Sequence, residues 1–330
     1  MSRTDQNNVE NHKASDDKPS WFIFFVRVRR RLEGILGGGL AWILRRMSRK
    51  RALRVADFLA WIIFTFFRRN KRVSLDVITL AFGDKYSKEE KLKIIRKSQV
   101  YMCRTIVDFL KFSTYTDEEM LALCSGVTGR EHLERALEKS PGGVIGLTGH
   151  IGAWEYGGAW VVKSGWALAA VGKEQRDPGV TKIMLDARAA TGIKHIPRTK
   201  EGNTEIIRSL RTKNTVLGLV SDQNGGWDGV FVDFFGIPAS SVKGPAYLAL
   251  KFNVPVVPIF AIWDGDRYRM EILPEVEIAR TGDPEKDILV NTQKFQKVLE
   301  VMVRKYPEQW LWGHRRWKTR PAGEGPVHKN

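Results

Sequence analysis

The pattern of hydrophobic and polar positions changes near residue 140. Before it, apolar residues recur at helical spacing, and Ser87 with Glu90 forms a capping-box sequence at the start of 87–113. After Pro141-Gly142-Gly143, short apolar runs alternate with helical patterns. The predicted strands are 144–148, 167–171, 215–220, 230–234, 255–262 and 268–273. The predicted helices are 72–82, 87–113, 131–139, 153–163, 179–191, 203–212, 241–252 and 286–305.

Alternation of strands and helices with short connections predicts an α/β fold with a mixed, mostly parallel central sheet covered by helices. The near-continuous apolar runs 216–220 and 255–262 suit central strands that are covered on both faces. The loops 148–153, 172–178 and 221–229 should then gather at one edge of the sheet, where open α/β sheets bind their ligands.

The amino-terminal region carries most of the charge. The chain of 330 residues has a net charge of +17, and residues 21–72 hold fourteen Lys or Arg against two acidic residues. Apolar blocks at 21–26, 35–44 and 58–67 separate these charges. Basic residues mixed with Trp, Phe and Ile favour an anionic membrane surface. A solvated basic face is the plainer interpretation, and binding to nucleic acid is disfavoured because tracking phosphates needs no large apolar blocks.

The apolar runs are short for a membrane span. The longest, 58–67, has ten residues, whereas a spanning helix needs about 20. We therefore expect helices that lie in the interface, with a tilted span near 21–44 as the alternative. The predicted organisation is a disordered tail at 1–20, membrane-attachment helices at 21–72, a catalytic domain at 73–322 and a flexible tail at 323–330.

A histidine and a glutamate lie on either side of the start of the predicted helix 153–163. His150 follows the strand 144–148, and Glu155 falls in the first turn of the next helix. Gly149 and Gly152 allow the chain reversal that would bring the two side chains together. Glu155 could then accept from one ring nitrogen of His150 while the other deprotonates an alcohol. A buried structural histidine is an equally good interpretation of this pattern alone.

Polar groups after later strands are further candidates. Arg176 could hold an anion or a developing oxyanion, or it could simply pair with Asp177 at the surface. Asp222 and Gln223 could line the same edge, although a plain turn also explains the following Asn-Gly-Gly. Ser241 and Lys243 could cradle a phosphate at a helix start, or Ser could be only an N-cap.

The end of the chain mixes cations with tryptophans. Residues 307–321 contain three tryptophans and four cations, which include Arg315, Arg316 and Lys318. Arginine forks suit phosphate oxygens, and tryptophan suits the boundary between water and lipid. A basic carboxy-terminal cap is the alternative.

Several chemistries have no support in the sequence. It contains no Walker A loop, no Gly-x-Ser-x-Gly elbow, no His-Glu-x-x-His and no Cys-x-x-Cys, so we expect no metal and no cofactor. Cys103 and Cys124 lack metal-site spacing and are expected in apolar helices as buried free thiols.

These features together resemble a known family, the bacterial lipid A biosynthesis acyltransferases of the lysophospholipid acyltransferase-like superfamily. The similarity runs from about residue 70 to 322. Its most specific part is the terminal Pro-Glu-Gln-Trp with His-Arg-Arg-Trp-Lys-Thr-Arg-Pro, at 307–310 and 314–321. The earlier matches are His150-x₄-Glu155, Arg176, Asp222-Gln223 and Phe-Val-Asp-Phe-Phe-Gly at 231–236.

The resemblance implies an enzyme at the cytoplasmic face of the bacterial inner membrane. Such enzymes transfer a fatty acyl group from acyl carrier protein to a hydroxyl of a lipid A precursor. By resemblance, His150 is the general base, Glu155 its partner and Arg176 an active-site arginine. Asp222 and Gln223 match the loop that lines the site, and Arg315, Arg316 and Lys318 match the basic terminal motif.

Two other functions remain open. The same chemistry could act on a glycerol phosphate lipid or a mannosylated inositol lipid. A protein that uses the fold only to hold membrane lipid is the non-enzymatic alternative.

Overall fold

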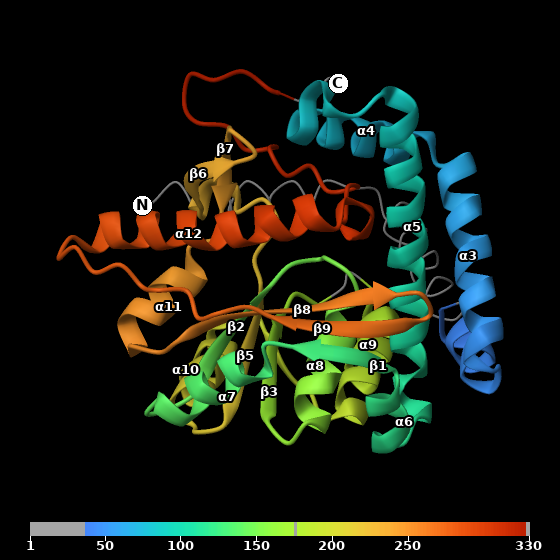
Figure 1. The fold of residues 1–330 in the computed structure, drawn as a ribbon, viewed down its shortest axis with the longest axis horizontal. Helices are drawn as coiled ribbons and strands as arrows, with labels where there is room; N and C mark the ends of the chain where they lie inside the picture. Colours follow the sequence, from blue (N-terminus) through green and yellow to red (C-terminus); the bar gives the residue numbers. More distant parts are fainter. Residues whose placement is uncertain (1–36, 175–176, 328–330) are drawn as a thin grey trace, which may run out of the picture.

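The computed structural model describes residues 37–174 and 177–327. Its centre is a seven-stranded sheet in the order β1-β9-β8-β2-β5-β3-β4, with helices packed around it (Figure 1). The strands are β1 Cys124–Thr128, β2 Val144–Thr148, β3 Ala167–Gly172, β4 Lys194–Pro197, β5 Thr215–Val220, β6 Val230–Phe234, β7 Ile237–Ser241, β8 Val256–Asp264 and β9 Arg267–Ile272.

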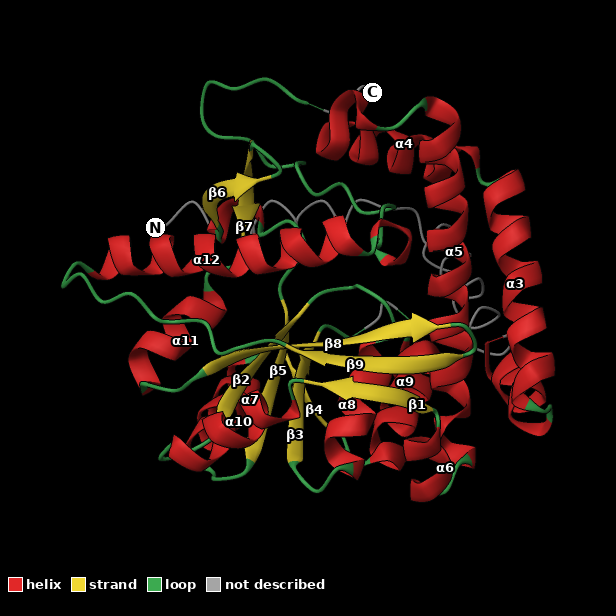
Figure 2. Ribbon diagram, in the orientation of Figure 1, coloured by secondary structure: helices red, strands yellow, loops and turns green. Residues whose placement is uncertain are grey.

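Before the first strand, helices dominate; afterwards they alternate with strands (Figure 2). Residues 37–46 are helical as well. The longer helices are α3 Arg49–Phe66, α4 Arg68–Phe82, α5 Lys88–Lys111, α6 Asp117–Ala122, α7 Arg130–Lys139, α8 Trp154–Lys163, α9 Pro178–Thr191, α10 Lys200–Arg211, α11 Gly244–Phe252 and α12 Pro284–Lys305.

The sheet is mixed and mostly parallel, as the alternation predicts. Strand β2 pairs in parallel with β5 and β8, and β3 pairs in parallel with β5 and β4. Only the β8–β9 pair runs antiparallel within this sheet. The carboxyl ends of β2, β5 and β3 therefore lie at one edge, which is where ligands bind to such sheets.

Alternate residues of the central strands face different helices. On β2 and β5, Ile145, Leu147, Leu217 and Leu219 pack in a cluster with residues of α11 and α12. Residues of the opposite parity face α8 and α9. This double coverage explains why these strands are apolar throughout and why they can be recognised in the sequence.

The structure corrects several expected elements. The run 230–234 is a strand, but it forms a separate antiparallel pair, β6–β7, that packs against α12. Strands β1, β4 and β7 were not expected: β1 and β4 are short edge strands, and β7 carries the polar sequence Ile-Pro-Ala-Ser-Ser. Cys124 begins β1 and is half-buried, whereas Cys103 is buried on α5; both are free thiols.

The amino-terminal helices pack onto α5. The inner face of α3 carries Ala52, Ala56 and Ala60, which lie against Cys103 and Val107 of α5. These small side chains permit close approach of the two helices. At the far end, Lys111 Nζ donates to the carbonyls of Leu44 and Met47 (both 2.8 Å) at the end of helix 37–46.

A buried carboxylate fixes α3 to α5 and to the β8–β9 hairpin. Asp108 of α5 is fully buried, pairs with Arg49 of α3 (N···O 2.7 Å) and accepts from the hydroxyl of Tyr268 on β9. Burial opposes the charge of Arg49, but the nearby carboxylate outweighs it and raises the pKa of that guanidinium. Three elements far apart in sequence therefore meet at one charge.

No helix within the described residues is both long enough and apolar enough to cross a bilayer. The predicted tail 1–20, and most of the alternative span at 21–44, lie outside these residues.

We predict that Asp108→Ala lowers the free energy of unfolding by about 3–5 kcal/mol, because it leaves Arg49 without its buried partner. Chemical denaturation of the purified protein measures this value. The control is Asp186→Ala, which removes an exposed ion pair with Lys182 and should leave stability unchanged. Equal stability of the two variants would contradict a structural role for the Asp108 contacts.

Candidate active site

His150 lies in a loop whose path needs glycine. Gly152 has a positive φ of 62°, and a Cβ there would lie 2.1 Å from the carbonyl oxygen of Ala261 on β8. The backbone N–H groups of Gly152 and Ala153 donate to Gln309 O (2.8 Å) and Ala261 O (2.7 Å). The loop is thus held between β8 and the carboxy-terminal segment, and His150 is placed at the carboxyl end of β2.

The partner of His150 is Asp222, which follows β5. His150 Nδ1 lies 2.9 Å from Asp222 Oδ1, and the backbone N–H of His150 donates to Oδ2 (2.9 Å). The indole Nε1–H of Trp310 donates to the same Oδ2 (2.8 Å). A carboxylate at Nδ1 requires the proton on that nitrogen, which leaves Nε2 of the neutral ring as an acceptor.

Burial and charge act in opposite directions on this pair. Burial lowers the pKa of His150, but the charge and hydrogen bond of Asp222, together with the charge of Glu155, outweigh it and raise that pKa above its ordinary value. Burial raises the pKa of Asp222, yet His150 and the hydrogen bonds to the carboxylate lower it to about 2. Asp222 is therefore ionised at neutral pH.

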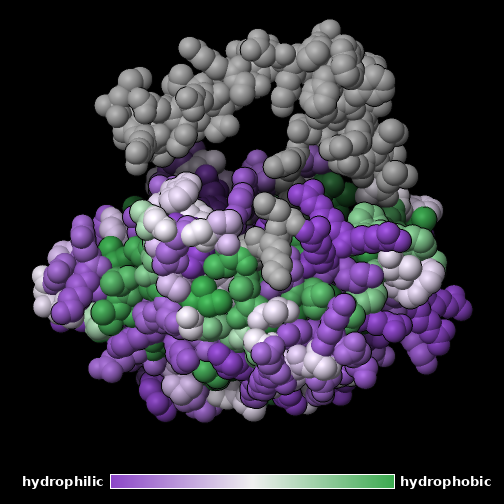
Figure 3. Space-filling model, turned by 90° about the horizontal axis from the view of Figure 1, so that it is seen from above, coloured by the Kyte–Doolittle hydropathy of each residue, from purple (hydrophilic) through white to green (hydrophobic). Residues whose placement is uncertain are grey.

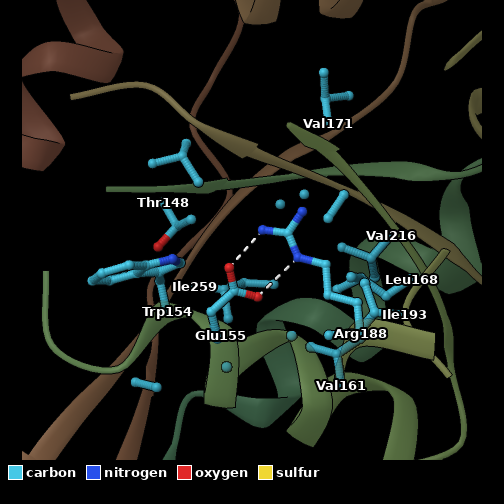
Figure 4. Close-up of a pocket in the computed structure, with 17 residues that line it drawn as sticks. Thr148, Trp154, Glu155, Val161, Leu168, Val171, Arg188, Ile193, Val216 and Ile259 are labelled. Atoms are coloured by element: carbon cyan, nitrogen blue, oxygen red, sulfur yellow. Dashed lines mark hydrogen bonds and ion pairs between the residues drawn. The ribbon is translucent and has the colours of Figure 1, made fainter. Parts of the chain in front are cut away.

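The expectation that Glu155 holds the ring of His150 is wrong. Both carboxylate oxygens of Glu155 contact Arg188 of α9, at 3.1 Å to Nε and 2.5 Å to Nη2 (Figure 4). Glu155 is buried in the first turn of α8, so its charge needs a partner, and α9 supplies one. No pattern in the sequence pointed to Arg188, because it lies on an otherwise ordinary amphipathic helix.

A cavity lies between the sheet and α8, and it reaches the end of β2 at Thr148, two residues before His150. The space within it is about 620 Å³, a figure that includes open solvent. The ring of Trp154 lines the cavity and contacts the His150 ring (centroids 5.0 Å apart). Its walls are mainly apolar; Figure 4 labels Val161, Leu168, Val171, Ile193, Val216 and Ile259 among its lining residues.

Four glycines make this space. Gly146 of β2 pairs in register with Gly218 of β5, and Gly157 and Gly158 lie in α8 on the other wall. Each weakens its own element, since glycine is unfavourable in helices and in strand interiors. Their shared placement around one cavity is consistent with space kept for a ligand. No sequence pattern pointed to them, because isolated glycines occur in many strands and helices.

The carboxy-terminal segment closes the site from the other side. Its three tryptophans, Trp310, Trp312 and Trp317, are almost fully buried, so the expectation that they meet the lipid boundary is wrong. They form a core with Phe234, Ile151 and Leu299. The segment therefore packs against the loops that carry His150 and Asp222 and holds them in place.

The comparisons with known proteins bear on this arrangement. Residues 25–319 match the family described as bacterial lipid A biosynthesis acyltransferase. The chain belongs to this family. The lipid A biosynthesis lauroyltransferase of Escherichia coli is 23% identical over 306 residues, which are 87% of this chain and 92% of that protein.

A second group of relatives carries a different name. The phosphatidylinositol mannoside acyltransferase of Mycolicibacterium smegmatis is 25% identical over 189 residues, or 57% of this chain and 60% of that protein. The protein of that name from Mycobacterium tuberculosis is 24% identical over 193 residues, 58% of this chain and 59% of that protein. The chain thus spans about three fifths of these mannoside acyltransferases.

The polar residues that the sequence suggests for the site of this lipid A acyltransferase family member differ in how deeply they are buried. Arg316 is fully buried, which contradicts its expected contact with substrate, whereas Arg315 is half-buried and Lys318 is exposed. Gln223 is half-buried beside Asp222. Arg176 lies outside the described residues.

The expected phosphate cradle at Ser241 is also wrong. Ser241 ends β7 instead of beginning a helix, is fully buried, and its hydroxyl accepts from Arg316 (2.5 Å). Lys243 is exposed immediately before α11. Within the described residues, no group of three or more His, Cys, Asp or Glu could hold a metal ion.

Proposed function

We propose that this protein is a membrane-associated O-acyltransferase that moves a fatty acyl group from acyl carrier protein to a hydroxyl of a lipid A precursor. The observation that carries the proposal is the His150–Asp222 pair beside an apolar cavity, in a chain of the lipid A acyltransferase family. An aligned base next to room for an alkyl chain is what such a transfer requires.

The transfer proceeds without an enzyme-bound intermediate. Nε2 of His150 takes the proton of the acceptor hydroxyl as its oxygen attacks the thioester carbonyl carbon. The carbon–sulfur bond then breaks, and the imidazolium returns the proton to the leaving thiolate. Asp222 stabilises the transient imidazolium and fixes the ring, which is the role that the sequence had suggested for Glu155.

The developing oxyanion needs positive charge or N–H donors. Arg176 remains our candidate from the sequence. The first turn of α8 is the second source, because its N-cap is Ala153, whose side chain cannot satisfy the N–H groups there. Glu155 and Arg188 neutralise each other in the cavity wall. We assign this ion pair a structural role, which is to stabilise the wall near the reacting carbonyl.

The cavity between the sheet and α8 holds the acyl chain. Its walls are mainly apolar, Trp154 in its lining contacts the catalytic ring, and the glycines at 146, 157, 158 and 218 also line it. A methylene chain needs no polar partners, and each CH₂ that it buries is worth about 0.8 kcal/mol. The depth of this cavity then sets the preferred chain length.

The charge of the protein suits both substrates. A net charge of +17 attracts an acidic carrier protein and anionic lipids over several ångströms, in a salt-dependent manner. Lys243, Arg315 and Lys318 are the exposed or half-exposed cations that we assign to the anionic acceptor. Gln223, beside the base, is assigned to its hydroxyl-bearing part.

A mannosylated inositol phospholipid is the second candidate acceptor. Relatives named phosphatidylinositol mannoside acyltransferase support it, although they match over a shorter part of the chain than the Escherichia coli lauroyltransferase. Incubation of the purified protein with each acceptor and one acyl-carrier thioester distinguishes the two by the mass of the product.

The outer face of α3 is the proposed membrane contact, on the cytoplasmic face of the inner membrane. Arg51, Arg54, Phe58 and Trp61 recur at helical spacing on this face, and all are exposed. On helix 37–46, Trp42 is exposed beneath the guanidinium of Arg46 (3.7 Å to the ring centroid). Seen from above, hydrophobic and hydrophilic residues mix at the end of the molecule where α3 and α4 lie (Figure 3).

We predict that His150→Ala lowers acyl transfer by about 10²–10⁴-fold with little change in substrate binding. In the wild type, the rate should fall as pH drops through a pKa above that of ordinary histidine, since a protonated ring cannot act as a base. Steady-state assays across pH measure both. The control is His132→Ala on α7, and near wild-type turnover by His150→Ala would exclude the mechanism.

We predict that Gly218→Val shifts the acyl preference to shorter chains. A Cβ at 218 has only the Ala169 carbonyl within 4 Å (3.7 Å), so the side chain enters the cavity without displacing the backbone. Competition among acyl-carrier thioesters of different lengths measures the preference. The matched control is Gly126→Val on β1, another strand glycine with open space around it. An unchanged preference in Gly218→Val would place the acyl chain elsewhere.

We predict that the double substitution Phe58→Ala and Trp61→Ala weakens binding to anionic vesicles by about tenfold or more, because two exposed aromatic side chains no longer enter the interface. Co-sedimentation with phosphatidylglycerol-containing vesicles measures it. Leu289→Ala with Val301→Ala on α12 removes comparable exposed apolar surface as a control. Equal losses in both variants would argue against α3 as the contact.

A further inference from the structure

Arg316 is a buried cation without a carboxylate partner. Its side chain is fully buried, and none of the ion pairs among residues 37–174 and 177–327 includes it. The guanidinium donates to the Ser240 carbonyl (2.5 Å), to Ser241 Oγ (2.5 Å) and to Gln296 Oε1 (3.0 Å). The guanidinium also lies over the Phe234 ring (5.0 Å to its centroid), but a ring and neutral acceptors leave much of the cost of burying this charge uncompensated.

Asp222 is a buried anion in the complementary position. It is 2% exposed, and its hydrogen-bond donors are a histidine ring, a backbone N–H and an indole N–H. When the ring of His150 is neutral, as a general base must be, none of these donors carries a charge. The carboxylate then also lacks a full counter-charge in direct contact.

One glutamine links the two charges. Gln296 of α12 accepts from Arg316 through Oε1 and donates through Nε2 to the carbonyl of Ser221 (2.9 Å), the residue before Asp222. Burial lowers the pKa of Arg316 to about 10, and the charge of Asp222 opposes that effect. Gln296 therefore connects the guanidinium, which stays protonated at neutral pH, to the backbone of the residue next to Asp222.

We propose that Arg316 is the internal counter-charge of Asp222 and a positioning residue for the His150–Asp222 pair, and not a ligand for substrate. This inference rests on the proposed function in which His150 is the base. A buried carboxylate beside an imidazole favours the protonated ring, which could not accept a proton. A fixed cation that Gln296 connects to the backbone next to Asp222 weakens that preference and keeps the ring available.

The other charged or titratable groups near His150 are already engaged with partners other than Asp222. Glu155 approaches from α8, and its charge is balanced by Arg188 of α9. From the carboxy-terminal segment, His314 Nε2 accepts from the backbone N–H of Asn224 (3.0 Å), so this ring is engaged with the loop after Asp222. Arg316 comes from the same segment and is a permanent cation that Gln296 connects to the backbone next to Asp222.

The test is an NMR titration of His150 in the full-length protein in detergent, with ¹³C-labelled histidine and assignment by His150→Ala. Arg316→Gln removes the cation, and Gln296→Glu places a carboxylate beside it, with loss of the hydrogen bond to the Ser221 carbonyl. Both should shift the titration of His150 to higher pH. Arg316→Lys keeps the charge and should titrate close to the wild type, even if the loss of its fork lowers turnover.

Arg320→Gln is the matched control, because Arg320 lies in the same segment but pairs with Glu324. Gln296→Glu keeps the size of the side chain and gives Arg316 a counter-ion, so it tests the proposal even if Arg316→Gln does not fold. A folded Gln296→Glu with the His150 titration of the wild type overturns the proposal, as does an equal shift in Arg320→Gln. The readout needs no turnover, so loss of the proposed acyltransferase function would appear separately, in the His150→Ala assay.

Discussion

The site depends on one buried carboxylate. Asp222 receives the His150 ring, the His150 backbone N–H and the Trp310 indole on two oxygens. Because a buried anion must have all its lone pairs satisfied, these contacts fix the end of β2, the end of β5 and the carboxy-terminal segment relative to one another. The position of the catalytic ring is therefore a property of three chain segments together.

The rest of the fold supports that arrangement with further buried charges. Glu155 with Arg188 joins α8 to α9, and Asp108 with Arg49 joins α5 to α3. Each pair connects segments that are distant in sequence, so removing one partner would leave a charge in a poor environment. Through Asp108, the helix that we assign to the membrane is held rigidly against the domain that carries His150.

The cavity reflects a balance between stability and function. Gly146 and Gly218 lie side by side in the centre of the sheet and line the cavity, although glycine weakens a strand interior. Helix α8, which faces them across the cavity, also carries two glycines, Gly157 and Gly158. Element stability is thus reduced around this cavity, where Trp154 contacts the His150 ring, and is retained in the surrounding core.

The sequence by itself determined the α/β class, the central strands and the family, because doubly covered strands are apolar throughout and the terminal motif is specific. It also singled out His150, Asp222 and the carboxy-terminal segment as important. Only the tertiary structure decided which groups meet: Asp222 and not Glu155 holds the ring, and Arg316 and the tryptophans lie inside. His150 and Trp310 lie 72 and 88 positions from Asp222, and contacts over such separations leave no periodic pattern in a sequence. Burial of a charged or aromatic side chain likewise depends on which other segments pack around it.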